Sequence, residues 1–190
     1  MNIKFISEIS LIEECIKGNE DAQKELYSKY AQKLYAICNR YSDNYQAAED
    51  ILQDSFICIF DNLKSFRSQG SFEGWMKRIT INTALQSLKK KKIISVSIDN
   101  EEHCQDITCD EDIFSKLSSK DIIAIIQLIP AGYRDVLNLF IIDGYSHKEI
   151  AKMLDITEAN SKLRLNRARN ILKEKLTLTN IESHELISKQ

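Results

Sequence analysis

The sequence has little of what breaks helices. Its 190 residues include only five glycines and one proline, while 43% are hydrophobic and 28% are charged. Antiparallel sheets joined by tight turns normally need more Gly, Asn-Gly and Pro than this. The composition also differs from that of a disordered tail and supplies enough apolar side chains for a hydrophobic core. We therefore expect an all-α protein of one or two small domains.

Long apolar segments are missing as well. The longest uncharged run, residues 122–133, is too short to span a bilayer, because a spanning helix needs about 20 apolar residues. The first ten residues reach Glu8 without an apolar signal core, so nothing resembles a secretory leader. From these absences we expect a soluble, cytoplasmic protein with no membrane insertion.

Cysteine is present but is not arranged for disulfide or metal chemistry. The five cysteines are irregularly spaced, which is typical of reduced thiols that mostly pack in a core. His103, Cys104 and Cys109 form the one cluster that suggests a metal, but they lack a CxxC pair and a second half-site. Because the three histidines are scattered and have no nucleophile beside them, we expect no catalytic residue, metal or cofactor.

The net charge of −2 conceals an alternation along the chain. Residues 1–63 carry 6 basic and 11 acidic side chains, whereas residues 64–92 carry 8 and 1. Residues 93–121 carry 2 and 8, and residues 122–175 carry 9 and 6. Two basic blocks set between acidic ones are compatible with nucleic-acid binding, although the net charge alone argues against it.

The apolar pattern divides the chain into two helical bodies. Helical spacing runs from residue 11 to residue 90, lapses into linker composition, and resumes from residue 121 to about residue 176. We predict two small helical domains joined by a flexible linker: a first domain over residues 8–93, the linker over 94–119, a second domain over 120–176 and a weakly ordered tail over 177–190.

The second body has the pattern of a helix-turn-helix. Ser146 and Glu149 have capping-box spacing, and the helix that they begin ends at Asp155, where a short turn leads to a longer helix. In this geometry the second helix enters the major groove of DNA. Its candidate contacts to phosphates and base edges are Thr157, Asn160, Lys162, Arg164 and Arg167, with Asn160 suited to adenine. A solvated basic helix is the alternative interpretation.

A second combination suited to nucleic acid lies between residues 62 and 92. Phe66 and Arg67 lie in a loop before a helix for which Ser71 is the expected N-cap, and that helix carries Trp75 and ends in a lysine run. Rings on which an unpaired base can stack, beside basic side chains along a phosphate path, are what single-stranded nucleic acid requires. Taken alone, Trp75 fits a core position as well as a stacking platform, and the lysine run fits a solvated helix end.

Together these segments resemble the extracytoplasmic-function (ECF) group of bacterial RNA polymerase sigma factors. The acidic helix AEDILQDSF is similar to the family's core-polymerase-binding segment, and SFEGWMKRITINTALQSLKKKK is similar to the segment that opens and reads the minus-ten element. Residues 129–172 are similar to the reader of the minus-thirty-five element. The three matches follow the family's order over roughly residues 10–176.

The resemblance implies a non-enzymatic sigma factor that binds core RNA polymerase, directs it to promoters, helps to melt the DNA and so initiates transcription. An anti-sigma factor is a further partner that the family implies. The residues placed against core polymerase are Glu49, Asp50, Gln53 and Asp54. Those placed near the minus-ten element are Phe66, Arg67, Trp75, Asn82, Lys89 and Lys90, and Arg164 and Arg167 would contact the minus-thirty-five element.

The chain departs from the family pattern in the turn and at the start of the reading helix. Asp155 stands where the family usually has Gly, and Asp tolerates a left-handed turn better than most residues. Ala159 and Asn160 stand where a Gly-Thr pair is usual, so the resemblance does not imply a promoter sequence.

Two other protein classes remain open. A dimeric helix-turn-helix repressor would use the second body in the same way but would have no use for the AEDILQDSF helix. A helical adaptor that does not bind DNA would leave the basic helix solvated and would show no salt-dependent affinity for DNA.

Overall fold

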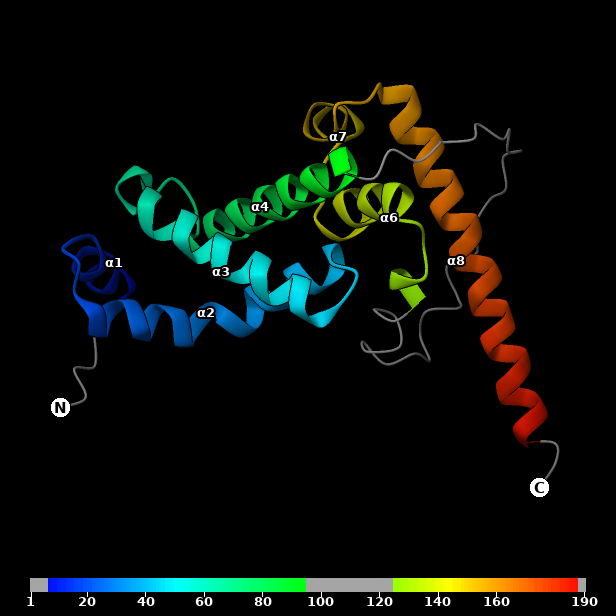
Figure 1. The fold of residues 1–190 in the computed structure, drawn as a ribbon, viewed down its shortest axis with the longest axis horizontal. Coiled ribbons are helices and arrows are strands. Elements are labelled where there is room, and N and C mark those ends of the chain that lie inside the picture. The colour runs from blue at the N-terminus through cyan, green and yellow to red at the C-terminus, as the bar shows by residue number, and fades with distance from the viewer. Residues whose placement is uncertain (1–6, 95–124, 188–190) are drawn as a thin grey trace. The chain divides into compact units, whose positions relative to one another are not determined.

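The computed structural model describes residues 7–94 and 125–187, which form two compact units (Figure 1). The described residues are helical with short connections and contain no strand, so the predicted all-α class is confirmed. The first unit contains α1 to α4, and the second contains α6 to α8. Almost all of the predicted linker, and the His103, Cys104 and Cys109 cluster within it, lies outside the described residues.

The first unit is built from α1 (Glu8–Ile16), α2 (Glu20–Tyr41), α3 (Tyr45–Asn62), the 3-10 turn η1 (Leu63–Ser65) and α4 (Phe72–Ile94). Polar residues begin its first three helices: Ser7, Asn19 and Asn44 each accept a hydrogen bond from a backbone N–H of the first turn. A short loop between η1 and α4 contains Ser68 with a φ of 54°.

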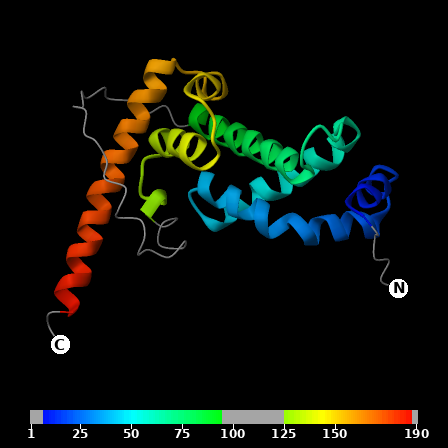
Figure 2. The ribbon, with the colours of Figure 1, turned by 180° about the vertical axis from the view of Figure 1, so that it is seen from behind.

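The core of the first unit lies between α2, α3 and α4, which run side by side in both views (Figures 1 and 2). The buried residues recur at helical spacing, which is why each of these helices has one apolar face. They include Leu26, Leu34, Cys38 and Tyr41 of α2, Ala48, Ile51, Phe56 and Ile59 of α3, and Phe72, Met76, Ala84 and Leu88 of α4.

The second unit is built from α6 (Ala131–Leu137), the π-helical turn η3 (Asn138–Ile142), α7 (His147–Leu154) and α8 (Glu158–Ile187). Pro130 precedes α6, where its missing N–H costs no helical hydrogen bond. α8 packs against α6 and α7 and continues through residues 177–187, which are most of the segment predicted as a weakly ordered tail. The core includes Ile129, Val136, Leu139, Ile150, Leu165 and Ala168.

The predicted helix-turn-helix is formed by α7 and α8. The Oγ of Ser146 accepts from the backbone N–H of Glu149 at 3.3 Å, and the carboxylate of Glu149 accepts from the N–H of Ser146 at 2.9 Å, so the capping box is confirmed. Asp155 ends α7 in the left-handed conformation, with a φ of 56° and a ψ of 51°. The Oγ1 of Thr157 then accepts from the N–H of Asn160 at 3.1 Å and begins α8.

Candidate functional site

The exposed face of α3 carries acidic side chains and one exposed apolar side chain. Asp50, Gln53 and Asp54 are exposed, and Glu49 is half-buried, while the opposite face is buried against α2 and α4. Ile57, one turn beyond Gln53, is 59% exposed. Ile57 is not among the residues predicted from the sequence, although its position four residues after Gln53 places it on the same face. An acidic surface with an exposed isoleucine suits a basic protein partner and disfavours nucleic acid.

A tyrosine pair lies at the start of this acidic face. The rings of Tyr35 on α2 and Tyr45 on α3 are 5.8 Å apart, and Tyr45 is 67% exposed. The hydroxyl of Tyr45 hydrogen-bonds to Glu49, which raises the pKa of Tyr45. The acidic face therefore continues into an exposed aromatic ring, a residue type enriched in protein interfaces.

Four aromatic rings form a cluster where the loop meets α4. The ring of Trp75 stacks on that of Phe72 at 5.6 Å, Phe66 lies 5.5 Å from Trp75 and 5.1 Å from Phe72, and Tyr30 meets Phe72 edge-on at 6.0 Å. Phe72 is fully buried, whereas Phe66 and Trp75 are half-buried. Trp75 thus packs on Phe66 and Phe72 and stays partly exposed to solvent, a position compatible with either interpretation.

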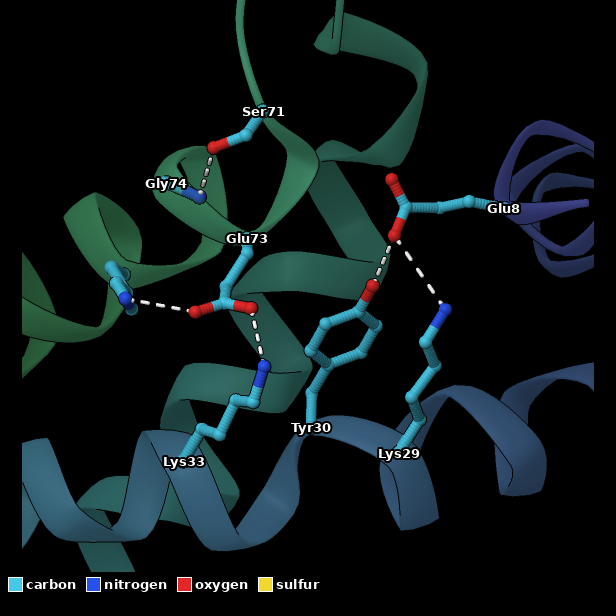
Figure 3. A network of polar contacts seen from close by, with 8 residues as sticks. Glu8, Lys29, Tyr30, Lys33, Ser71, Glu73 and Gly74 are labelled. Carbon is cyan, nitrogen blue, oxygen red and sulfur yellow. Dashed lines mark hydrogen bonds and ion pairs between the residues drawn. The ribbon is translucent and has the colours of Figure 1, made fainter.

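Ion pairs link the start of α4 to α2 (Figure 3). Glu73 accepts from the Nζ of Lys33 on α2 at 2.6 Å and pairs with Lys77 at 2.8 Å. The hydrogen bonds from these two lysines lower the pKa of Glu73 to about 2. Ser71, the predicted N-cap, accepts from the N–H of Gly74 at 3.1 Å. These contacts set the orientation of the helix turn that carries Phe72 and Trp75.

A second polar contact joins α1 to the same cluster (Figure 3). The hydroxyl of Tyr30 donates to the carboxylate of Glu8, and the Nζ of Lys29 lies 3.6 Å from the same carboxylate. Burial, followed by the bond to Glu8, raises the pKa of Tyr30. Tyr30 stays protonated at neutral pH, so it remains a hydrogen-bond donor while its ring supports Phe72.

Replacing Glu73 with glutamine should destabilise the first unit in a pH-dependent way. Because the pKa of Glu73 is lowered on folding, its stabilising effect is present above the ordinary value of 4.5 and is lost as the pH falls toward 2. Urea unfolding followed by the fluorescence of Trp75, the only tryptophan, should show Glu73→Gln less stable than wild type at neutral pH.

The difference between these two proteins should shrink as the solution is acidified below about pH 5, the region where unfolded-state carboxylates take up protons. Glu20→Gln is the matched control, because Glu20 is exposed and its pair with Lys24 is long, at 3.8 Å. An equal loss of stability in Glu73→Gln at every pH would contradict the proposed ion-pair contribution.

One exposed face of α4 continues from the aromatic cluster. Asn82 and Lys89 lie seven and fourteen residues after Trp75, so all three share a side of the helix, and Asn82, Lys89 and Lys90 are exposed. Arg78 lies between Trp75 and Asn82 on this side and is exposed too. Arg78 is not among the residues predicted from the sequence, although its spacing of three residues from Trp75 places it on this side. Arg67, in the loop, is exposed.

Over residues 158–176, α8 buries one stripe of side chains, and its other side chains are half-buried or exposed. Ser161, Leu165, Ala168 and Leu172 are buried, at a spacing of three to four residues. Thr157 and Lys162 are exposed, and Asn160, Arg164 and Arg167 are half-buried along one side of the helix. The Nε of Arg164 donates to the Oδ1 of Asn160 at 2.8 Å. The predicted DNA contacts on α8 therefore lie outside the buried stripe.

His147 links the two helices of the helix-turn-helix, a role that the sequence analysis did not anticipate. Its ring stacks on Phe140 of η3 at 4.4 Å, and its Nδ1 lies 2.9 Å from the Oγ of the buried Ser161. Burial, followed by the nearby charges of Lys162 and Arg169, lowers the pKa of His147. The neutral imidazole thus ties the start of α7 to the first turns of α8.

The described residues contain neither a metal-binding cluster nor a membrane-spanning helix. Within residues 7–94 and 125–187 no three His, Cys, Asp or Glu side chains are grouped in a way that could hold a metal ion. Nor does any helix in this part of the chain combine the length and apolarity needed to cross a bilayer.

The protein families and the individual proteins that this chain resembles are all RNA polymerase sigma factors. The family Sigma-70 region 2 matches residues 26–93, and the family Sigma-70, region 4, matches residues 119–172. The chain is 30% identical to the ECF RNA polymerase sigma factor SigW of Bacillus subtilis over 176 residues, covering 87% of this chain and 94% of that protein. It is 25% identical to the ECF RNA polymerase sigma-E factor of Haemophilus influenzae, covering 90% of this chain and 96% of that protein.

A solved structure with a related fold is that of the sigma factor RpoE from Bartonella quintana, crystallised with the anti-sigma factor NepR. The TM-score is 0.52 at 22% identity, and the match covers 81% of this chain and 96% of that one. This likeness concerns the fold.

Proposed function

Because the chain belongs to the ECF RNA polymerase sigma factors, we propose that it divides its function among three surfaces. The acidic face of α3 binds core RNA polymerase, the aromatic cluster and α4 bind the minus-ten element, and α8 binds the minus-thirty-five element. Sigma factors direct transcription initiation and are regulatory proteins. We expect the chain to catalyse no reaction and to act in the cytoplasm, where it meets polymerase and DNA.

The observation that carries this proposal is the pairing of opposite chemistries within the first unit. Asp50, Gln53 and Asp54 make one exposed face acidic, while Trp75 and the basic side chains of α4 make another suited to nucleic acid. A protein that bound only duplex DNA would not need the acidic face with its exposed Ile57. A helical adaptor that does not bind DNA would not need half-buried aromatic rings beside basic side chains that can contact phosphates.

At the minus-ten element, Phe66 and Trp75 would stack on unpaired bases. Arg67 in the loop and Asn82, Lys89 and Lys90 along α4 would hold the phosphates of the same strand, with Arg78 as an addition from the structure. Stacking is sequence-tolerant because every base has a π-face, so the phosphate contacts serve to set the path of the strand.

At the minus-thirty-five element, the start of α8 would enter the major groove. Thr157 caps the helix there, and Asn160, Lys162, Arg164 and Arg167 follow within three turns. The basic side chains favour phosphates, and arginine in particular can bind guanine edges.

An anti-sigma factor is the further partner that we propose. The α3 face leaves Ile57 and Tyr45 exposed among acidic residues when polymerase is absent. A second protein that covered this face would keep the chain from binding polymerase. The relative from Bartonella quintana is crystallised with an anti-sigma factor.

Replacing Arg164 with alanine tests the division of labour. We expect initiation from a promoter with a minus-thirty-five element to fall about 5- to 100-fold, since one arginine contact to DNA contributes roughly 1–3 kcal/mol. Core binding, measured by co-elution with polymerase, should be unchanged.

Lys173→Ala is the matched control for Arg164→Ala, because Lys173 is an exposed basic residue of the same helix about four turns from its start. It should initiate like wild type. Equal loss of core binding and of initiation in Arg164→Ala would contradict the assignment of separate surfaces.

A further inference from the structure

The solvent-exposed face of α8 contains a leucine. Leu163 is 45% exposed, whereas Leu165 and Leu172 of the same helix are 3% and 9% exposed. A step of two residues along a helix is a rotation of about 200°. Leu163 therefore lies on the side of α8 opposite Ser161 and Leu165, which are buried against the rest of the unit. Its side chain therefore adds little to the core of the second unit.

Isolated exposed apolar residues are common on protein surfaces, so exposure alone assigns no function. The position of Leu163 is what gives it meaning. It lies six residues after the cap Thr157, in the second turn of the helix that is expected to enter the groove. Its neighbours on the exposed side, Lys162 and Asn166, are polar and exposed.

The adjacent arginine is held to one side of this leucine. The Nε of Arg164 donates to the Oδ1 of Asn160, one turn earlier, at 2.8 Å. The bond directs the start of the guanidinium toward Asn160, along the side of α8, instead of over Leu163. Basic side chains therefore flank the leucine, where they can reach phosphates, and the apolar side chain lies between them.

The major groove offers one apolar group among base edges, the C5-methyl of thymine. We propose that Leu163 is a specificity-determining residue that contacts a thymine methyl group in the minus-thirty-five element. The inference rests on the proposed function, because it requires α8 to lie in the major groove of that element. It adds a base preference that the polar residues of α8 do not supply.

The test uses holoenzyme and a promoter recovered by selection from a random-sequence library with wild-type protein. Each thymine of the minus-thirty-five duplex is replaced singly by deoxyuridine, which lacks only the methyl group. One position should weaken wild-type binding about fourfold, since burial of one methyl-sized group contributes roughly 0.8 kcal/mol and 1.4 kcal/mol is a tenfold change. Leu163→Ala should bind the thymine and deoxyuridine promoters equally.

Two variants complete the double-mutant comparison. Leu163→Met keeps an apolar side chain and should retain sensitivity to the methyl group. Ile141→Ala is the matched control, because Ile141 is also an exposed aliphatic residue of the second unit, at 53%, but lies on η3. It should leave the ratio of thymine to deoxyuridine affinities at the wild-type value.

The inference is overturned if no deoxyuridine position affects wild-type binding, or if Leu163→Ala keeps the wild-type sensitivity. It is also overturned if the selected promoters have no thymine in the minus-thirty-five element. Failure of the proposed function is distinguishable from these results, because holoenzyme would then select no promoter at all, or scrambling the whole element would leave binding unchanged.

Discussion

Replacing Asp50 and Asp54 with lysine is expected to weaken holoenzyme formation about 100-fold or more while the protein stays folded. Both side chains are exposed on α3, so neither contributes to the core. Against the basic partner surface that the proposed function requires, the two substitutions convert attraction to repulsion. Like-charge juxtaposition in an interface costs several kcal/mol, which corresponds to a loss of affinity of about 100-fold or more.

Fluorescence polarisation of labelled protein titrated with purified core polymerase measures this effect. The wild-type affinity should also decrease with added salt, because the proposed contact involves exposed charges. Glu13→Lys with Glu20→Lys is the matched control, since it makes the same change in net charge at exposed residues of α1 and α2. If both double variants lose affinity equally, net charge and not the α3 face governs binding.

Replacing Trp75 with alanine should have the second large effect, a loss of open promoter complexes with little loss of core binding. Stacking of one base on an aromatic side chain is worth about 1–3 kcal/mol. The substitution also removes the ring that packs on Phe72 and Phe66, so the remaining platform is less ordered. We expect open-complex formation to fall by about 10- to 100-fold.

Permanganate reactivity of thymines in the minus-ten region reports strand opening, and co-elution reports core binding. Trp75→Phe should restore most of the opening, because it keeps a ring for stacking. A template with a preformed bubble should rescue Trp75→Ala only in part, since melting is supplied but the stacking platform is not. Full rescue would mean that Trp75 acts in separating the strands and not in holding the separated base.

The features that the sequence predicts well are those set by nearby residues. The capping box of Ser146 and Glu149 depends on a spacing of three residues, and the left-handed Asp155 depends on the turn that follows α7. Helical spacing likewise predicts the buried faces of α2 and α3, because a helix repeats every 3.6 residues wherever it packs.

The features that the sequence does not predict arise between segments that are distant along the chain. Glu73 pairs with Lys33, forty residues earlier, and Tyr30 donates to Glu8, twenty-two residues earlier. Nothing in the local pattern of either partner indicates the other. The stacking of His147 on Phe140 and its bond to Ser161 likewise depend on how α7, η3 and α8 pack together.

A third group of features, exposed apolar side chains, can be predicted from the sequence once the buried face of each helix is identified. Ile57 and Leu163 are apolar, so hydrophobicity alone assigns them to the core, yet they lie on the exposed sides of α3 and α8. Counting 100° per residue from the buried stripe identifies both as surface residues. Apolar residues on the far side of an amphipathic helix are therefore worth testing as contacts to a partner.

Run-off transcription with purified core RNA polymerase on a library of genomic fragments tests the central claim most directly. With the added chain, polymerase should initiate at a discrete set of fragments whose start sites share upstream elements, and the chain should co-elute with core. Core alone should not initiate at these sites. If the chain directs no initiation from any fragment and does not co-elute with core, the sigma-factor account is contradicted.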